Sequence, residues 1–165
     1  MIQSVAIIGA GISGLTAGCA LRKYGFKVDI FERSDSISEF GAGITLSRNA
    51  TSLLRKLDLY DDLEKNSYRP KGSFIRNYST GKDIAYVDFT KDFIAADRRD
   101  VVKIFSERFV DMGGHLHLSQ EIERVDPETG EVFLSAGGGQ SADLVLACDG
   151  IKSSIRENRF DKTEP

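Results

Sequence analysis

A glycine-rich turn near the start of the chain constrains its fold more than any other feature. The turn contains Gly9, Gly11 and Gly14, and it directly follows an apolar run at residues 5–8. Such a run, ended by glycine, is typical of a strand buried on both faces. The small apolar residues at 15–21 have helical spacing and predict a helix that ends near Gly25. The order of strand, tight turn and helix predicts the first part of a βαβ unit.

A second strand and an acidic residue complete this pattern. Residues 27–31 alternate and stop at Glu32, 18 residues after Gly14, so the two strands are expected to be parallel. Gly9 allows the tight turn, Gly11 leaves room for a pyrophosphate, and Gly14 lets helix and strand pack closely. The helix N-terminus offers free N–H groups to the phosphates. Glu32 can accept hydrogen bonds from both ribose hydroxyls and repels a 2′-phosphate. The pattern predicts a site for the ADP half of FAD or NAD, and this motif alone does not distinguish the two.

The remaining residues predict a three-layer, Rossmann-like α/β fold. All 165 residues are expected to belong to one domain. A long loop is expected at 34–47, a small antiparallel β-meander at 122–134 and a glycine loop at 137–139. A turn at 79–81 is expected to join two strands, at 74–78 and 83–89. Helices are expected at 50–57, with Leu53, Leu54 and Leu57 on one inner face, and at 98–112. Strands are expected at 74–78, 83–89, 115–118, 122–125, 132–134 and 144–148.

Composition excludes several classes of function. A net charge of −3 and a pI of about 5.5 argue against a nucleic-acid surface, which needs a basic face. The sequence has no apolar run long enough to span a membrane. Only two cysteines, Cys19 and Cys148, are present, which favours the reducing cytoplasm and a role as core residues. The sequence shows no cysteine or acidic cluster that would complete a metal site with His115 and His117, so no metal site is expected and the pair is expected to face solvent.

Four separated stretches resemble the salicylate hydroxylase and para-hydroxybenzoate hydroxylase class of single-component FAD-dependent aromatic monooxygenases. The first is residues 5–33, described above. The second is the glycine loop and helix start at 41–50, where members usually carry proline at the position of Arg48. The third is residues 98–105, similar to an Arg-x-x-Leu motif, in which Arg98 matches the family arginine that contacts the cofactor and its neighbour Arg99 is the less favoured alternative. The fourth is residues 143–156, similar to an Asp-Gly motif with its trailing Ser and Arg.

The resemblance implies an FAD/NAD(P)-binding fold in an oxidoreductase. FAD would be the cofactor, NAD(P)H the external reductant, and a small aromatic molecule the substrate hydroxylated with O₂. Because the flavin carries that chemistry, no catalytic acid, base or nucleophile is assigned. The resemblance and the glycine pattern together imply these cofactor-binding residues: Gly9, Ala10, Gly11, Ile12, Ser13, Gly14, Glu32, Arg33, Gly43, Arg98, Asp149 and Gly150.

The sequence also lacks parts that members of the family carry. Members are longer, with a later Gly-Asp motif and a large sheet over the substrate, and this sequence contains no Gly-Asp dipeptide. We expect either a fragment of a longer enzyme or a truncated product. Three alternatives stay open: a geranylgeranyl-reductase-like flavoprotein, a binding-only module, and an NAD-dependent dehydrogenase, which would not require Asp149-Gly150. Substrate identity and oligomeric state do not follow from these residues.

Overall fold

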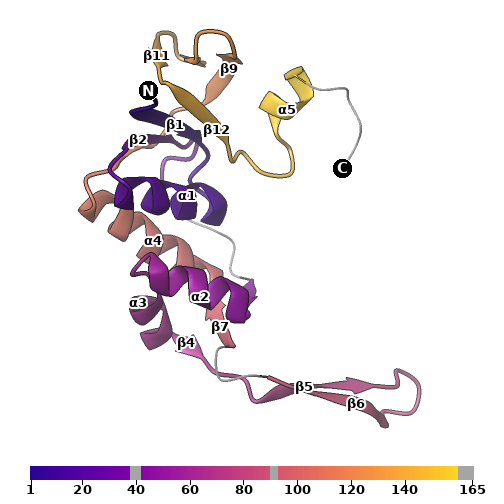
Figure 1. Cartoon of the computed structure of the whole chain (residues 1–165). Helices are drawn as coiled ribbons and strands as arrows, with labels where there is room; N and C mark the ends of the chain where they lie inside the picture. The colour runs from indigo at the N-terminus through magenta and orange to yellow at the C-terminus, as the bar shows by residue number, and fades with distance from the viewer. Residues whose placement is uncertain (38–41, 90–92, 160–165) are drawn as a thin grey trace. The chain divides into compact units, whose positions relative to one another are not determined.

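The computed structural model describes residues 1–37, 42–89 and 93–159, and the chain divides into two compact units (Figure 1). One unit contains residues 1–39 and 102–165, and the other contains residues 40–101. The boundary falls inside helix α4 (Arg98–Asp111).

The first unit is built on a four-stranded sheet. Its strands are β1 (Ser4–Ile8), β2 (Lys27–Phe31), β8 (His115–His117) and β12 (Leu144–Ala147), in the order β12-β1-β2-β8. All three neighbouring pairs are parallel. The parallel pairing of β1 with β2, joined through helix α1 (Ile12–Lys23), is therefore confirmed.

One face of this sheet packs against helices. A Cβ added to Gly18 of α1 would lie 2.8 Å from Ile30 of β2 and 2.9 Å from the Phe109 ring of α4, so only glycine leaves room for this packing. Phe109 is fully buried, and so is Cys19, whose thiol lies 3.6 Å from the Phe105 carbonyl oxygen. Burial raises the pKa of Cys19 to about 11, which keeps the thiol protonated and unreactive.

The opposite face packs against an antiparallel meander. It consists of β9 (Ile122–Asp126), β10 (Glu131–Leu134) and β11 (Gly139–Ser141), in the order β11-β10-β9. Ile122 and Val132 of the meander share an apolar cluster with Ile8 of β1. Helices, sheet and meander thus form the expected three layers.

The third strand of the meander corrects the sequence prediction. Residues 137–139 were expected as loop and the meander was expected to end at 134, but Gly139 pairs with Phe133 in the β10–β11 ladder. Glycine has low strand propensity, so this pairing is set by the neighbouring strand and not by local preference.

Strand β12 is less buried than its apolar sequence predicts. Leu144, Val145 and Leu146 are half-buried and Ala147 is exposed. Within the described part of the chain β12 pairs only with β1, which places it at one edge of the sheet. An edge strand is covered less completely than a central one. The short helix α5 (Ser154–Arg159) follows it.

A carboxylate fastens the start of β1 to the start of β12. Asp143 Oδ2 accepts hydrogen bonds from the backbone N–H groups of Gln3 (2.9 Å) and Ser4 (2.8 Å) and from the Ser4 hydroxyl (2.8 Å). In return, Ser4 Oγ accepts from the Asp143 N–H at 3.1 Å. The Gln3 bond, followed by the two Ser4 bonds, lowers the pKa of Asp143 to about 2.

We predict that Asp143→Asn lowers the melting temperature at neutral pH and loses this effect in acid. Because the folded-state pKa is depressed, the charge contributes stability above the ordinary pKa of 3.8, and this contribution disappears as pH falls to about 2. Thermal unfolding of both proteins between pH 7 and pH 2 measures the difference. A gap that stays constant over this range would contradict the prediction.

The second unit has its own sheet. Strands β3 (Gly43–Leu46), β7 (Ile94–Asp97) and β4 (Ser67–Tyr68) lie in the order β3-β7-β4, and both pairs are antiparallel. Two helices, α2 (Arg48–Lys56) and α3 (Tyr60–Lys65), belong to the same unit.

Two predictions for this unit were wrong in part. The expected loop at 34–47 contains strand β3, because Gly43 to Leu46 pair with β7, some fifty residues later; Gly41 lies outside the described residues. The expected inner face of α2 included Leu53, which is 50% exposed, whereas Leu54 and Leu57 are buried. Helix α3 and strands β4 and β7 were not expected.

The predicted hairpin is confirmed with slightly shifted ends. Strand β5 (Gly72–Arg76) pairs antiparallel with β6 (Asp83–Asp88). The Asn77 side chain accepts backbone hydrogen bonds from Ser79 and Thr80 in the connecting turn, and Gly81 there has φ +68°. Figure 1 shows the two strands as a long ribbon.

Candidate functional site

The glycine turn lies at the carboxyl end of β1. Gly9 has φ +100°, and its N–H donates to the Phe31 carbonyl oxygen at 2.8 Å. A Cβ at Gly9 would lie 2.5 Å from the Cys148 carbonyl oxygen, and a Cβ at Gly14 would overlap the Gly9 carbonyl oxygen. The roles predicted for these two glycines, a tight turn and close packing of helix on strand, are therefore confirmed.

Helix α1 begins directly at this turn with an open N-terminus. Gly11 is the N-cap, with extended backbone and no side chain to act as a cap, and its carbonyl accepts the first helical hydrogen bond from Leu15 N–H at 3.0 Å. The N–H groups of Ile12, Ser13 and Gly14 therefore have no acceptor within the helix. Together with the helix dipole, they form an arrangement that favours an anion such as a phosphate.

Glu32 joins the turn to the loop after β2. Its Oε2 accepts from the Ala10 N–H at 2.8 Å, and its Oε1 accepts from the Ser34 N–H at 2.9 Å. Burial raises the pKa of this half-buried carboxyl, but the two backbone bonds and the nearby Arg33 outweigh burial and hold the pKa below its ordinary value of 4.5. Glu32 is thus ionised at neutral pH, and the exposed Arg33 side chain follows it directly.

The Asp149-Gly150 turn lies beside the glycine turn. Cys148 N–H donates to the Ile8 carbonyl at 2.8 Å, which continues the β12–β1 pairing up to Asp149. A Cβ on Gly9 would lie 3.2 Å from the Asp149 Cα atom. The carboxyl ends of β12, β1 and β2 thus gather the first and fourth stretches in one place, at the edge where open α/β sheets bind ligands.

The remaining two candidates belong to the other unit. Gly43 pairs with Asp97 in the β3–β7 ladder, and the Arg98 N–H donates to the Ala42 carbonyl at 3.3 Å. The second stretch and the start of the third are therefore neighbours within that unit. Arg99, the alternative to Arg98, is bound to Asp97 by a 2.6 Å ion pair that holds the pKa of Asp97 down at about 2.

Sequence reasoning missed the residues that support Glu32. The Glu32 N–H donates to the His117 carbonyl at 2.9 Å, and the Glu32 carbonyl accepts from the Gln120 N–H at 2.8 Å. Ser119, with φ +55°, donates its N–H to the Ser34 carbonyl at 2.9 Å. These are backbone contacts between distant segments, so no side-chain type in the sequence predicts them. The positive φ of Ser119 likewise has no sequence signal and is seen only in the structure.

The two histidines face solvent, with side chains 72% and 38% exposed, and both also lie close to a carboxylate. His117 Nε2 lies 2.6 Å from Asp29 Oδ1, and its ring stacks on Phe31 with 4.9 Å between ring centroids. His115 Nδ1 lies 3.4 Å from the same oxygen. The histidine, cysteine and acidic residues within 1–37, 42–89 and 93–159 form no group of three or more suited to a metal ion.

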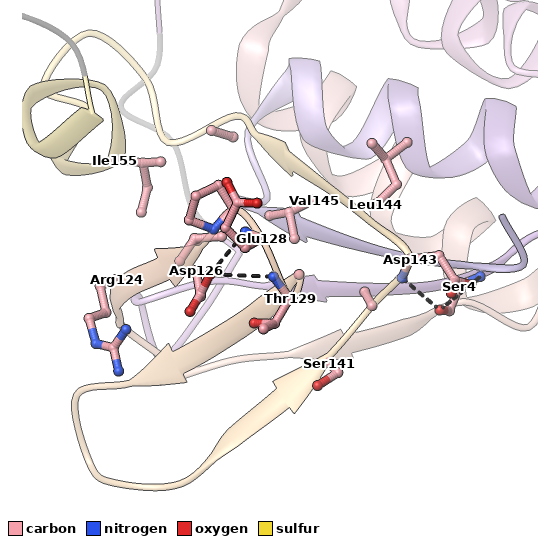
Figure 2. Close-up of a pocket in the computed structure, with 15 residues that line it drawn as sticks. Ser4, Arg124, Asp126, Glu128, Thr129, Ser141, Asp143, Leu144, Val145 and Ile155 are labelled. Carbon is pink, nitrogen blue, oxygen red and sulfur yellow. Dashed lines mark hydrogen bonds between the residues drawn. The ribbon is translucent and has the colours of Figure 1, made fainter.

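A cavity of about 630 Å³ lies elsewhere in the first unit, along β12 and the meander (Figure 2). Its wall includes Ser4, Arg124, Asp126, Asp143 and Ile155, and none of the twelve candidate cofactor residues lines it. The cavity is therefore separate from the glycine turn.

Residues 1–37, 42–89 and 93–159 contain no helix that is long and apolar enough to cross a membrane.

A family model described as "FAD binding domain" matches residues 3–161 of the chain. The chain belongs to the FAD binding domain family. This match decides the question that the glycine motif left open between FAD and NAD.

Known members with similar sequences are monooxygenases. The chain is 25% identical to 6-hydroxynicotinate 3-monooxygenase of Bordetella bronchiseptica, over 93% of this chain and 42% of that protein. It is 27% identical to 3-amino-4-hydroxybenzoate 2-monooxygenase of Streptomyces cremeus, over 93% and 41%. This FAD binding domain thus spans about two-fifths of the length of the curated relatives it matches.

A solved structure shares the fold. The tetrameric form of 2-methyl-3-hydroxypyridine-5-carboxylic acid oxygenase superimposes with a TM-score of 0.88 at 27% identity, over 94% of this chain and 42% of that one. The Rossmann-like α/β architecture expected from the sequence is therefore confirmed.

Proposed function

We propose that this chain is the FAD-binding part of a flavin-dependent monooxygenase that uses NAD(P)H and O₂ to hydroxylate a small aromatic substrate. The observation that carries the proposal is the family match over residues 3–161, together with the open helix N-terminus next to an ionised Glu32. The names of the relatives, two of which act on a hydroxynicotinate and an aminohydroxybenzoate, support the substrate class.

The residues of the site suit the adenosine end of FAD. The glycine positions keep side chains out of the turn, since a Cβ at Gly9 or Gly14 has no room. The N–H groups of Ile12, Ser13 and Gly14 would donate to the pyrophosphate. Glu32 would accept from the ribose hydroxyls, beside Arg33. The other proposed contacts are Ala10, Gly11, Gly43, Arg98, Asp149 and Gly150.

The chain's own residues bind and orient, and none is assigned a proton-transfer step. Bound FAD supplies the redox chemistry, taking reducing equivalents from NAD(P)H for use with O₂. Glu32, negatively charged at neutral pH, would disfavour a 2′-phosphorylated adenosine at this particular site. Residues 1–165 would form one FAD-binding domain that is incomplete without the rest of a longer protein. A cytoplasmic location is also proposed, since Cys19 and Cys148 are both free.

Titration of FAD into the chain, followed by flavin fluorescence, tests the binding part of the proposal. We expect saturable binding by the wild type. We also expect Glu32→Ala to weaken binding by about 1–3 kcal/mol, the usual effect of losing hydrogen bonds to a charged group. An unchanged affinity in the variant would mean that the ADP half binds elsewhere.

The catalytic part of the proposal is tested on the full-length protein. It should purify yellow, and an aromatic substrate should stimulate NAD(P)H oxidation with O₂ consumption and appearance of a hydroxylated product. Oxidation of NAD(P)H without hydroxylation would favour the reductase alternative. A colourless protein that takes up no added FAD would overturn the assignment.

A further inference from the structure

Both oxygens of the Glu32 carboxylate are occupied by the protein's own backbone. Oε2 accepts from Ala10 N–H at 2.8 Å and Oε1 accepts from Ser34 N–H at 2.9 Å. The first donor belongs to the glycine turn and the second to the loop that follows β2. One side chain therefore connects the glycine turn to the loop after β2.

The Ala10 contact holds a buried part of the turn. Ala10 is only 3% exposed, and it stands between Gly9, with φ +100°, and the helix cap Gly11. A buried N–H group that loses its acceptor is unfavourable, so the turn would be expected to shift without the carboxylate. Glu32 itself is half-buried, and its lowered pKa keeps it charged and able to accept both bonds.

These two bonds leave capacity for a ligand. An ionised carboxylate has about four lone-pair sites, so two lone pairs remain after it has accepted hydrogen bonds from the Ala10 and Ser34 N–H groups. The backbone bonds fix the direction of the remaining two, and holding the turn is compatible with accepting from a ribose diol.

We propose that Glu32 is a positioning residue that orders the glycine turn before the cofactor binds, in addition to contacting the ribose. This inference deepens the proposed function and rests on it for the identity of the ligand. The ordered turn presents the N–H groups of Ile12, Ser13 and Gly14 to the pyrophosphate, so Glu32 supports phosphate binding without touching a phosphate.

Amide hydrogen exchange of the cofactor-free chain, followed by NMR, tests the ordering directly. In Glu32→Ala, the Ala10 and Ser34 amides should exchange about tenfold to a hundredfold faster, as expected for loss of a hydrogen bond to a charged group. In Glu32→Gln, the single amide oxygen serves only one N–H while the NH₂ opposes the other, so one of the two amides should stay protected. Glu123→Ala, an exposed glutamate on β9, is the matched control and should change neither rate.

A pair of nucleotides separates positioning from sugar contact. ADP carries the ribose hydroxyls and 2′,3′-dideoxy-ADP lacks them. If Glu32 orders the turn, Glu32→Ala should weaken dideoxy-ADP binding by at least about threefold, and ADP binding by more.

The outcomes are distinct. Wild-type exchange rates at Ala10 and Ser34 in Glu32→Ala, or unchanged dideoxy-ADP affinity, would overturn the positioning role. Failure of the wild type to bind either nucleotide would count against the proposed function, while the exchange rates would still decide the positioning role.

Discussion

Gly9→Ala is expected to lower the free energy of unfolding by about 3 kcal/mol and to weaken FAD binding by more than about tenfold. Two penalties combine at this position. A left-handed backbone, here φ +100°, costs an L-residue about 1–2 kcal/mol. The added Cβ would also lie 2.5 Å from the Cys148 carbonyl oxygen, and such overpacking costs about 1–3 kcal/mol. Urea unfolding and FAD titration measure the two effects.

Two other glycines provide matched controls for this variant. Gly25 has φ +87° but no atom within 4 Å of an added Cβ, so Gly25→Ala isolates the backbone penalty. Gly14 lies in α1, where an added Cβ overlaps the Gly9 carbonyl, so Gly14→Ala isolates the steric penalty. Gly25→Ala should leave FAD affinity intact. Equal losses of stability in Gly9→Ala and Gly25→Ala would contradict the packing described for the turn.

Phe109→Ala is expected to have a comparable or larger effect on stability, about 3–5 kcal/mol. The Phe109 ring is fully buried and fills the space next to Gly18 of α1 and next to Gly114. Its removal leaves a cavity under the helix that begins at the glycine turn. Chemical denaturation measures the loss.

The next residue on the same helix is the control for Phe109. Val110 is 50% exposed, so Val110→Ala should change the free energy of unfolding by less than about 0.5 kcal/mol. Similar losses in the two variants would show that Phe109 is not part of the core.

The first crossover could be predicted from sequence because its signals are local. The apolar run before Gly9, the helix that ends near Gly25 and the alternation ending at Glu32 all occur within one short segment. The structure reproduces each element there, and the same holds for α4, whose buried residues follow helical spacing.

The strands that the sequence predicted as loops were missed for a different physical reason. Strand β3 has only four residues and begins with a glycine, and its conformation depends on pairing with β7, which only the folded chain provides. Strand β11 begins with the last of three consecutive glycines and is likewise fixed by its partner. Tertiary pairing overrides local propensity at such positions.

Only part of the candidate site could be predicted, because contacts between distant segments have no local sequence signal. Glu32 was identified from its spacing to Gly14, but its bonds to Ala10 and Ser34 were not, since they follow from the backbone path of two loops. The other unexpected supports, Ser119 and Gln120, also act through backbone groups. A sequence pattern identifies side chains but does not predict backbone hydrogen bonds between distant loops.

We propose that the turn between β1 and α1 holds the pyrophosphate of FAD, with Glu32 on its sugar. An NMR titration of the labelled chain with FAD tests this most directly. We expect the largest saturable amide shifts at Ile12, Ser13 and Gly14, together with a change in the Glu32 carboxylate. Shifts confined to the cavity near Arg124 and Asp143, with the turn unchanged, would contradict it.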